Sequence, residues 1–149
     1  MFHVKPFEPK DYVEITKGLP NWLDMNPLEM GILYKRRGLA YSGFCNGELV
    51  ICAGVGIPWK GLGEVWAVLS PHAPKCHLSI NRAAKRFLWA MIKEADLRRV
   101  QAQVDLSFTK GLKWLEWLGF KFDGVSEKYG PNGEDFVRYV LFPSEVKHG

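Results

Sequence analysis

The sequence predicts an α+β domain in which helices pack on one mixed β-sheet, and three observations support this fold class. Hydrophobic residues make up 47% and charged residues 24% of the 149 residues, which is ordinary for a globular domain. Segments with strand-like alternation and segments with helical spacing follow one another along the chain. Neither a repeat nor a Pro/Ser-rich linker divides it, so we expect a single domain over residues 1–149 with six to seven strands and about four helices.

The N-terminal part of the chain predicts one strand followed by two helices. Residues 2–7 alternate apolar and polar side chains, and Pro6 places this strand near an edge or an end of the sheet. A helix over residues 9–18 begins with proline and closes at a glycine. A second helix starts at Asn26, whose side chain can cap it, and continues to about Arg37.

Three strands are expected in the middle of the chain. Residues 39–45 and 48–56 have the composition of strands, and Asn46-Gly47 between them is the strongest short signal for a β-hairpin. A further turn over residues 58–63 leads into an apolar strand over residues 64–69.

A long amphipathic helix and four shorter elements complete the order. A helix capped by Ser79 runs to about residue 95. A strand over residues 100–106 is followed by a helix over 112–118 that ends at Gly119, by a short strand, and by a last strand over 136–142. The inner stripe of the long helix consists of Ile80, Ala83, Ala84, Phe87, Leu88, Met91, Ile92 and Ala95.

The segment Leu112–Phe120, LKWLEWLGF, with its flanking strands resembles the last third of the GNAT superfamily of N-acetyltransferases, where this helix also ends in Gly-Phe. The expected order, β-α-α-β-β-β-α-β-α-β-β, is similar to the GNAT fold over nearly the whole chain. This resemblance implies transfer of an acyl group from acetyl-coenzyme A (acetyl-CoA) to the amine of a small molecule or a peptide. It also implies a homodimer, because family members often pair through their C-terminal strands.

The resemblance also indicates where the cofactor would bind. The family loop, Gln/Arg-x-x-Gly-x-Gly/Ala, follows a strand ending in valine and offers backbone N–H groups to the pyrophosphate. When the chain is aligned on Pro71, His77 and Ser79 occupy the two glycine positions, and Pro74 stands near the arginine position without an N–H. The implied cofactor-binding residues are Val68 and Leu69 for the pantetheine arm, and Lys75, Cys76, His77, Leu78 and Ser79 for the pyrophosphate.

Acetyl transfer needs a base, and the resemblance implies Glu64, at the start of the fourth strand, in that role. Asp105 is the other carboxylate expected near the centre of the sheet, on a face that the sequence does not fix. The family's proton donor, a tyrosine, is replaced by Leu115, and the family asparagine and alanine fall near Phe108 and Gly111. A tyrosine from elsewhere could replace the donor only if the fold brings it there; the chain has Tyr12, Tyr34, Tyr41, Tyr129 and Tyr139.

Cysteine usage favours a cytoplasmic protein without disulfides or zinc. Cys45, Cys52 and Cys76 are odd in number and contain no CxxC pair. Cys76 lies near His72 and His77 at irregular spacing, so we expect ordinary loop residues, an inert Cys76 and no metal site.

A second reading is a catalytically inactive interaction or structural protein on the same scaffold. The missing glycines and tyrosine favour it, as do Trp22 and Trp59 in or beside loops, whereas the other tryptophans are expected in the core. Tyr129-Gly130-Pro131-Asn132-Gly133 after the Gly-Phe ending resembles phage-associated GNAT-like proteins, which implies a phage or prophage origin and a protein partner. The net charge of +4 is spread in short clusters, so it does not indicate a nucleic-acid partner, and no apolar run is long enough to cross a membrane.

Overall fold

The computed structural model describes residues 1–19 and 26–146 and has a seven-stranded sheet with strand order β1-β2-β3-β4-β5-β7-β6. The α+β class and the expected order of elements are confirmed. The strands are β1 (Phe2–Pro6), β2 (Gly38–Cys45), β3 (Glu48–Trp59), β4 (Leu62–Leu69), β5 (Arg99–Asp105), β6 (Lys121–Ser126) and β7 (Phe136–Leu141). The helices are α1 (Pro9–Ile15), α2 (Pro27–Arg37), α3 (His77–Ala95) and α4 (Thr109–Leu118), with short 3-10 turns at Ala73–Cys76 and Pro143–Glu145.

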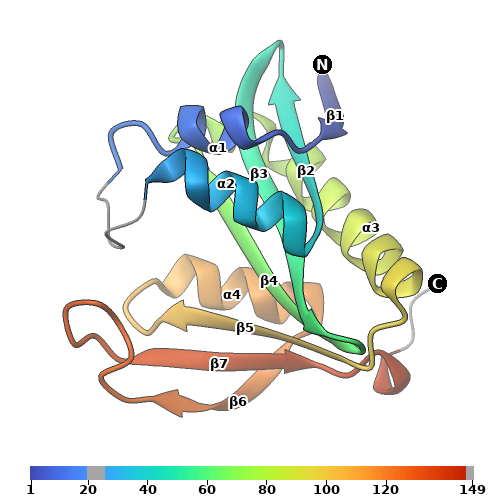
Figure 1. Ribbon diagram of the computed structural model, residues 1–149, viewed down its shortest axis with the longest axis vertical. Coiled ribbons are helices and arrows are strands. Elements are labelled where there is room, and N and C mark those ends of the chain that lie inside the picture. Colours follow the sequence, from blue (N-terminus) through green and yellow to red (C-terminus); the bar gives the residue numbers. More distant parts are fainter. Residues whose placement is uncertain (20–25, 147–149) are drawn as a thin grey trace.

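The helices cover both faces of the sheet, and each face has its own core. Figure 1 shows α1 and α2 over one face of β2–β4 and α3 over the opposite face. The larger core joins α3 and α4 to the sheet around Ile51, Val100 and Leu141, which are almost fully buried. The smaller core, under α1 and α2, surrounds Phe7 and Cys52. No helix in the described part of the chain is long and apolar enough to cross a lipid bilayer.

Local sequence signals explain several element boundaries. The Asn26 side chain accepts hydrogen bonds from the N–H groups of Leu28 and Glu29, as expected of a helix cap. Asn46 and Gly47 both have positive φ angles, 51° and 84°, which is the conformation that a two-residue hairpin turn requires. Gly119 ends α4 with φ 106°, so its role as a helix stop is confirmed.

The exposure of one helical tryptophan, Trp117, differs from the expectation. Trp117 is 49% exposed because α4 buries Gly111, Leu115 and Leu118 on its inner face, and Lys85 lies over its ring. The prediction of a core position for Trp117 is therefore wrong. Trp59, at the end of β3, is 63% exposed, and Trp22 lies outside the described residues.

The sheet divides where β4 meets β5. These strands are parallel and paired only from Leu62 with Arg99 to Glu64 with Gln101. Beyond Glu64, β4 stays paired with β3 as far as Leu69, while β5 stays paired with β7 as far as Asp105. The two strands consequently diverge and leave an opening between the halves of the sheet (Figure 1).

Candidate functional site

The opening between β4 and β5 is the centre of a large cavity of about 1270 Å³. Its walls come from β4 (Val65–Leu69), from β5 (Ala102–Asp105), and from facing residues of α3 and α4. On the α1 and α2 side the cavity reaches an aromatic group in which Tyr34 stacks on Trp66, with ring centres 4.1 Å apart. The cavity therefore connects the two faces of the sheet through the gap between its halves.

Among the residues that the structure describes, no strand pairs with the edge of β4 that faces this gap beyond Glu64. The Ser70 N–H donates to the Val50 carbonyl across the β3–β4 ladder, at 3.0 Å. Because strand residues alternate in the direction of their main-chain groups, Val68 then bonds toward β3, and Ala67 and Leu69 direct their N–H and C=O groups into the opening. Of the two residues implied for the pantetheine arm, Leu69 thus offers its backbone to the cavity and Val68 does not.

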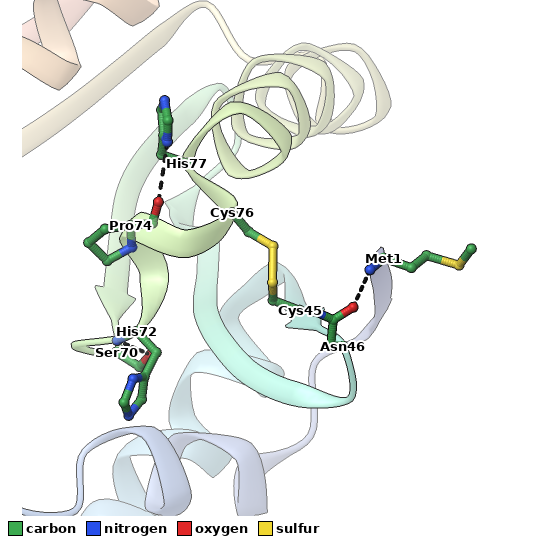
Figure 2. Close-up of a disulfide and its surroundings, with 8 residues drawn as sticks. All are labelled: Met1, Cys45, Asn46, Ser70, His72, Pro74, Cys76 and His77. Carbon is green, nitrogen blue, oxygen red and sulfur yellow. Dashed lines mark hydrogen bonds between the residues drawn. A yellow bond between two sulfur atoms is a disulfide. The ribbon is translucent and has the colours of Figure 1, made fainter.

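The loop after β4 uses most of its own N–H groups, as Figure 2 shows in part. The His72 N–H donates to the Ser70 hydroxyl, and the N–H groups of Ala73 and Lys75 donate to the carbonyls of Ser70 and His72. Pro74 has no N–H. Backbone donors for an anion must therefore come from the first turn of α3, whose cap residue supplies no side-chain hydrogen bond.

The implied pyrophosphate residues lie together at this helix start. The helix begins at His77, two residues before the expected cap Ser79, because the 3-10 turn leads straight into it. The side chains of Lys75, His77 and Leu78 are exposed, and Ser79 is half-buried. His77 Nδ1 lies 3.2 Å from the Pro74 carbonyl oxygen.

Cys76 is bonded to Cys45, and this corrects the expectation of a protein without disulfides. The two Cα atoms are 6.4 Å apart, within the usual range for a disulfide, because the fold sets the end of β2 beside the 3-10 turn (Figure 2). Cys52 is free and buried, and burial raises the pKa of its thiol to about 12. Cys76 therefore fixes the start of α3 to the sheet and has no free thiol to offer a ligand.

The side chains of His72, Cys76 and His77 each have a different partner and do not surround a common point. His72 contacts Glu48 at 3.5 Å, His77 contacts the loop backbone, and Cys76 is in the disulfide. Within residues 1–19 and 26–146, no group of three or more His, Cys, Asp or Glu side chains could hold a metal ion.

The helices that border the cavity carry a positive charge. Basic side chains outnumber acidic ones by six to two along α3 and α4. Lys110 is the one of these basic residues that lines the cavity, and the excess positive charge on the two helices favours anionic ligands near them. The basic residues are Arg82, Lys85, Arg86, Lys93, Lys110 and Lys113, and the acidic ones are Glu94 and Glu116.

Glu64 lies at the point where β4 and β5 separate, beside a second and smaller cavity of about 320 Å³. Gln101 donates its side-chain amide to Glu64 Oε2 at 3.2 Å, and Arg99 Nε donates to the Gln101 oxygen at 2.9 Å. These contacts hold the exposed carboxylate in place. The sequence offered no motif for Gln101; only its register opposite Glu64 in the parallel pair reveals the contact.

Asp105 lines the large cavity but is bound by its own turn. Its carboxylate accepts hydrogen bonds from the Ser107 hydroxyl at 2.7 Å and the Ser107 N–H at 2.9 Å. These bonds hold the pKa of Asp105 below its usual range. Asp105 is accordingly a poorer proton acceptor than an unbound carboxylate.

No proton donor occupies the family's tyrosine position, since Leu115 is buried in the core. Phe108 caps α4, and its ring packs so close to Gly111 that a Cβ there would lie 2.6 Å from it. Among the tyrosines, Tyr12, Tyr34 and Tyr41 line the large cavity, and Tyr34 and Tyr129 line the small one. Burial, reinforced by the neighbouring Tyr12, raises the pKa of Tyr34 to about 12.

Comparison with known proteins gives the fold through structure alone. No family model and no curated protein matches the sequence. A GNAT-family acetyltransferase from Streptococcus pneumoniae aligns over 95% of this chain and 99% of its own, with a TM-score of 0.72 and 17% identity. The ribosomal-protein-S18-alanine N-acetyltransferase from Escherichia coli aligns over 100% and 97%, with a TM-score of 0.77 and 15% identity. A variant of the spermidine N-acetyltransferase from Vibrio cholerae aligns over 96% of each chain, with a TM-score of 0.77 and 13% identity.

Proposed function

We propose that this GNAT-fold chain is an acyl-CoA-dependent N-acyltransferase that acts on an amine. The observation that supports it most strongly is the unpaired inner edge of β4, which a strand-like ligand can pair with inside a cavity of about 1270 Å³. Two similar structures are described as transferring acetyl groups to nitrogen, one on spermidine and one on a ribosomal-protein alanine.

Acetyl-CoA fits this site in two respects and departs from it in one. The pantetheine arm contains amide groups, and the Ala67 and Leu69 backbone offers complementary donors and acceptors. The basic border along α3 and α4 suits the phosphates. In the loop expected to bind the pyrophosphate, in contrast, the N–H groups donate to acceptors within the loop. The first turn of α3 is therefore the remaining source of backbone donors for an anion.

In the proposed reaction, Glu64 accepts a proton from the substrate ammonium, directly or through one water. When bound, acetyl-CoA supplies a thioester as the acyl donor. The neutral amine would form the C–N bond to the acyl carbon as the C–S bond breaks, and its nitrogen would then release a second proton to solvent. The sulfur of the leaving coenzyme A would gain a proton from solvent, because Leu115 has none to give. Gln101 and Arg99 keep Glu64 oriented throughout.

Calorimetric titration with acetyl-CoA tests binding, and release of free coenzyme A thiol in the presence of amines tests transfer. Glu64→Gln should keep cofactor binding and lower transfer by roughly 10²–10⁴-fold, the usual contribution of a general base. Glu94→Gln, an exposed carboxylate of α3 outside both cavities, is the matched control and should change neither quantity. Absence of binding at millimolar acetyl-CoA would overturn the proposal and leave a non-catalytic scaffold.

A further inference from the structure

The small cavity beside Glu64 has a distinctive set of charges. Among the described residues that line it, Glu64 is the one carboxylate, and Arg37 and Arg138 are the two basic residues. Since Gln101 bonds to Oε2 of Glu64, Oε1 of the same carboxylate remains available for a ligand.

The guanidinium groups of Arg37 and Arg138 differ in the partners that they have within the protein. Arg138 Nε lies 3.5 Å from an Asp123 carboxylate oxygen, and its other nitrogens donate to the Ser126 hydroxyl and the Asp123 carbonyl, each at 3.0 Å. Arg37, the last residue of α2, forms no ion pair or side-chain hydrogen bond within the described ranges. Arg37 is therefore the cation in this lining that is left for a ligand.

Apolar and aromatic side chains form part of the remaining wall, to which Gln103 and Tyr129 add polar groups. Ile57, Pro58 and the stacked pair of Tyr34 and Trp66 contribute to it. The Nε1–H of Trp66 is the one buried side-chain polar atom without a hydrogen-bond partner in the part of the chain that the structure describes. A buried donor of this kind is usually explained by a bound acceptor or water. At about 320 Å³ the cavity is near the lower limit for a small-molecule site, which favours a compact ligand.

The geometry points to an acceptor that carries its amine and a carboxylate on one small molecule, as an amino acid does. This inference rests on the proposed function, because it takes Glu64 as the group that receives the amine. Arg37 then binds the carboxylate, and the aromatic wall contacts an apolar side chain. A polyamine is disfavoured, because its second cationic group would meet Arg37 or Arg138 and find no second carboxylate in the lining.

The test is calorimetric binding of the proteinogenic L-amino acids, their α-amides and spermidine to the wild-type protein, followed by transfer assays with acetyl-CoA. We expect at least one amino acid to bind more tightly than its amide and than spermidine. Arg37→Gln should weaken the binding of that amino acid by roughly ten- to hundredfold, because the hydrogen bond between the guanidinium group and the ligand carboxylate is lost. The affinity for the amide, which has no carboxylate, should stay unchanged. Arg36→Gln, in the same exposed helix end but outside the cavity, is the matched control and should change neither.

Equal affinity for amino acids and their amides, or tighter binding of spermidine, would overturn the inference. So would the same loss of affinity in the Arg36 and Arg37 variants, because both would then act through general charge. If an amino acid binds through Arg37 but no acetyl-CoA binds to the same preparation, the ligand class stands and the proposed transfer reaction fails.

Discussion

The disulfide between Cys45 and Cys76 makes a quantitative prediction about stability. The two cysteines are 31 residues apart in sequence, so the bond closes a long loop in the unfolded chain. The loop-closure relation gives an entropy loss of about 12 cal/mol/K, or about 3.7 kcal/mol at 25 °C, by which the bond destabilises the unfolded state. For a domain of this size, that corresponds to a melting temperature higher by roughly 7–15 °C.

Two assays check this prediction on the same protein. Thiol titration of the chain unfolded without reductant should find one cysteine, Cys52, and titration after reduction should find all three. Urea unfolding with and without dithiothreitol then gives the free-energy difference. Reduction of the wild-type chain changes no side-chain volume, so it is the cleaner perturbation.

Cysteine variants test whether the Cys45–Cys76 disulfide is the source of the stabilisation. The Cys45→Ser/Cys76→Ser double variant should unfold at the midpoint of the reduced wild type and ignore dithiothreitol. Cys52→Ala should keep its response to the reductant. A titration of three thiols before reduction, or an unfolding midpoint that reductant does not move, would refute the reasoning.

Two further predictions follow from the strand edge and from an ion-pair cluster. Leu69→Pro removes an N–H that faces the opening, so it should weaken acetyl-CoA binding with a small loss of stability. Val68→Pro removes a bond to β3 and should destabilise the fold by about 1–3 kcal/mol, the usual cost of a buried group left without its partner. Calorimetry and urea unfolding of both variants check this, and equal destabilisation would contradict the assigned direction of the strand. The hydrogen bond from Arg99 holds the pKa of Asp123 below its usual range, so this carboxylate stabilises the fold above the unfolded pKa near 4 and its contribution is lost as pH falls through the lower folded value. In Asp123→Asn, stability measured from pH 7 to pH 2 should therefore fall less steeply on the acid side, and an unchanged acid slope would show that Asp123 contributes nothing to it.

Local patterns were sufficient for most of the fold. The Asn46-Gly47 turn and the Gly119 helix stop depend on conformations that few residues adopt, so their sequence signals were specific. The inner stripe of α3 is buried or half-buried as its spacing predicted. On α4, residue type alone predicted a buried Trp117, but the helix turns that position away from the sheet.

Less of the candidate site could be predicted from the sequence, because its contacts join segments that are far apart in the chain. The pairing of Cys45 with Cys76 depends on where β2 ends relative to the turn before α3, which no local pattern encodes. The contact of Gln101 with Glu64 depends on the parallel register of β4 and β5. Arg37 looked like one more basic residue at a helix end, and only the tertiary fold places it in the cavity lining.

The divergence of β4 and β5 also bears on how the domain holds together as a unit. Within the part of the chain that the structure describes, strand pairing between the two halves of the sheet is limited to the pairs from Leu62–Arg99 to Glu64–Gln101. Cooperativity between the halves must therefore pass through the side chains that α3 and α4 pack against both, rather than through the hydrogen-bond ladder. The same separation that creates room for a ligand makes this packing the main mechanical link across the molecule.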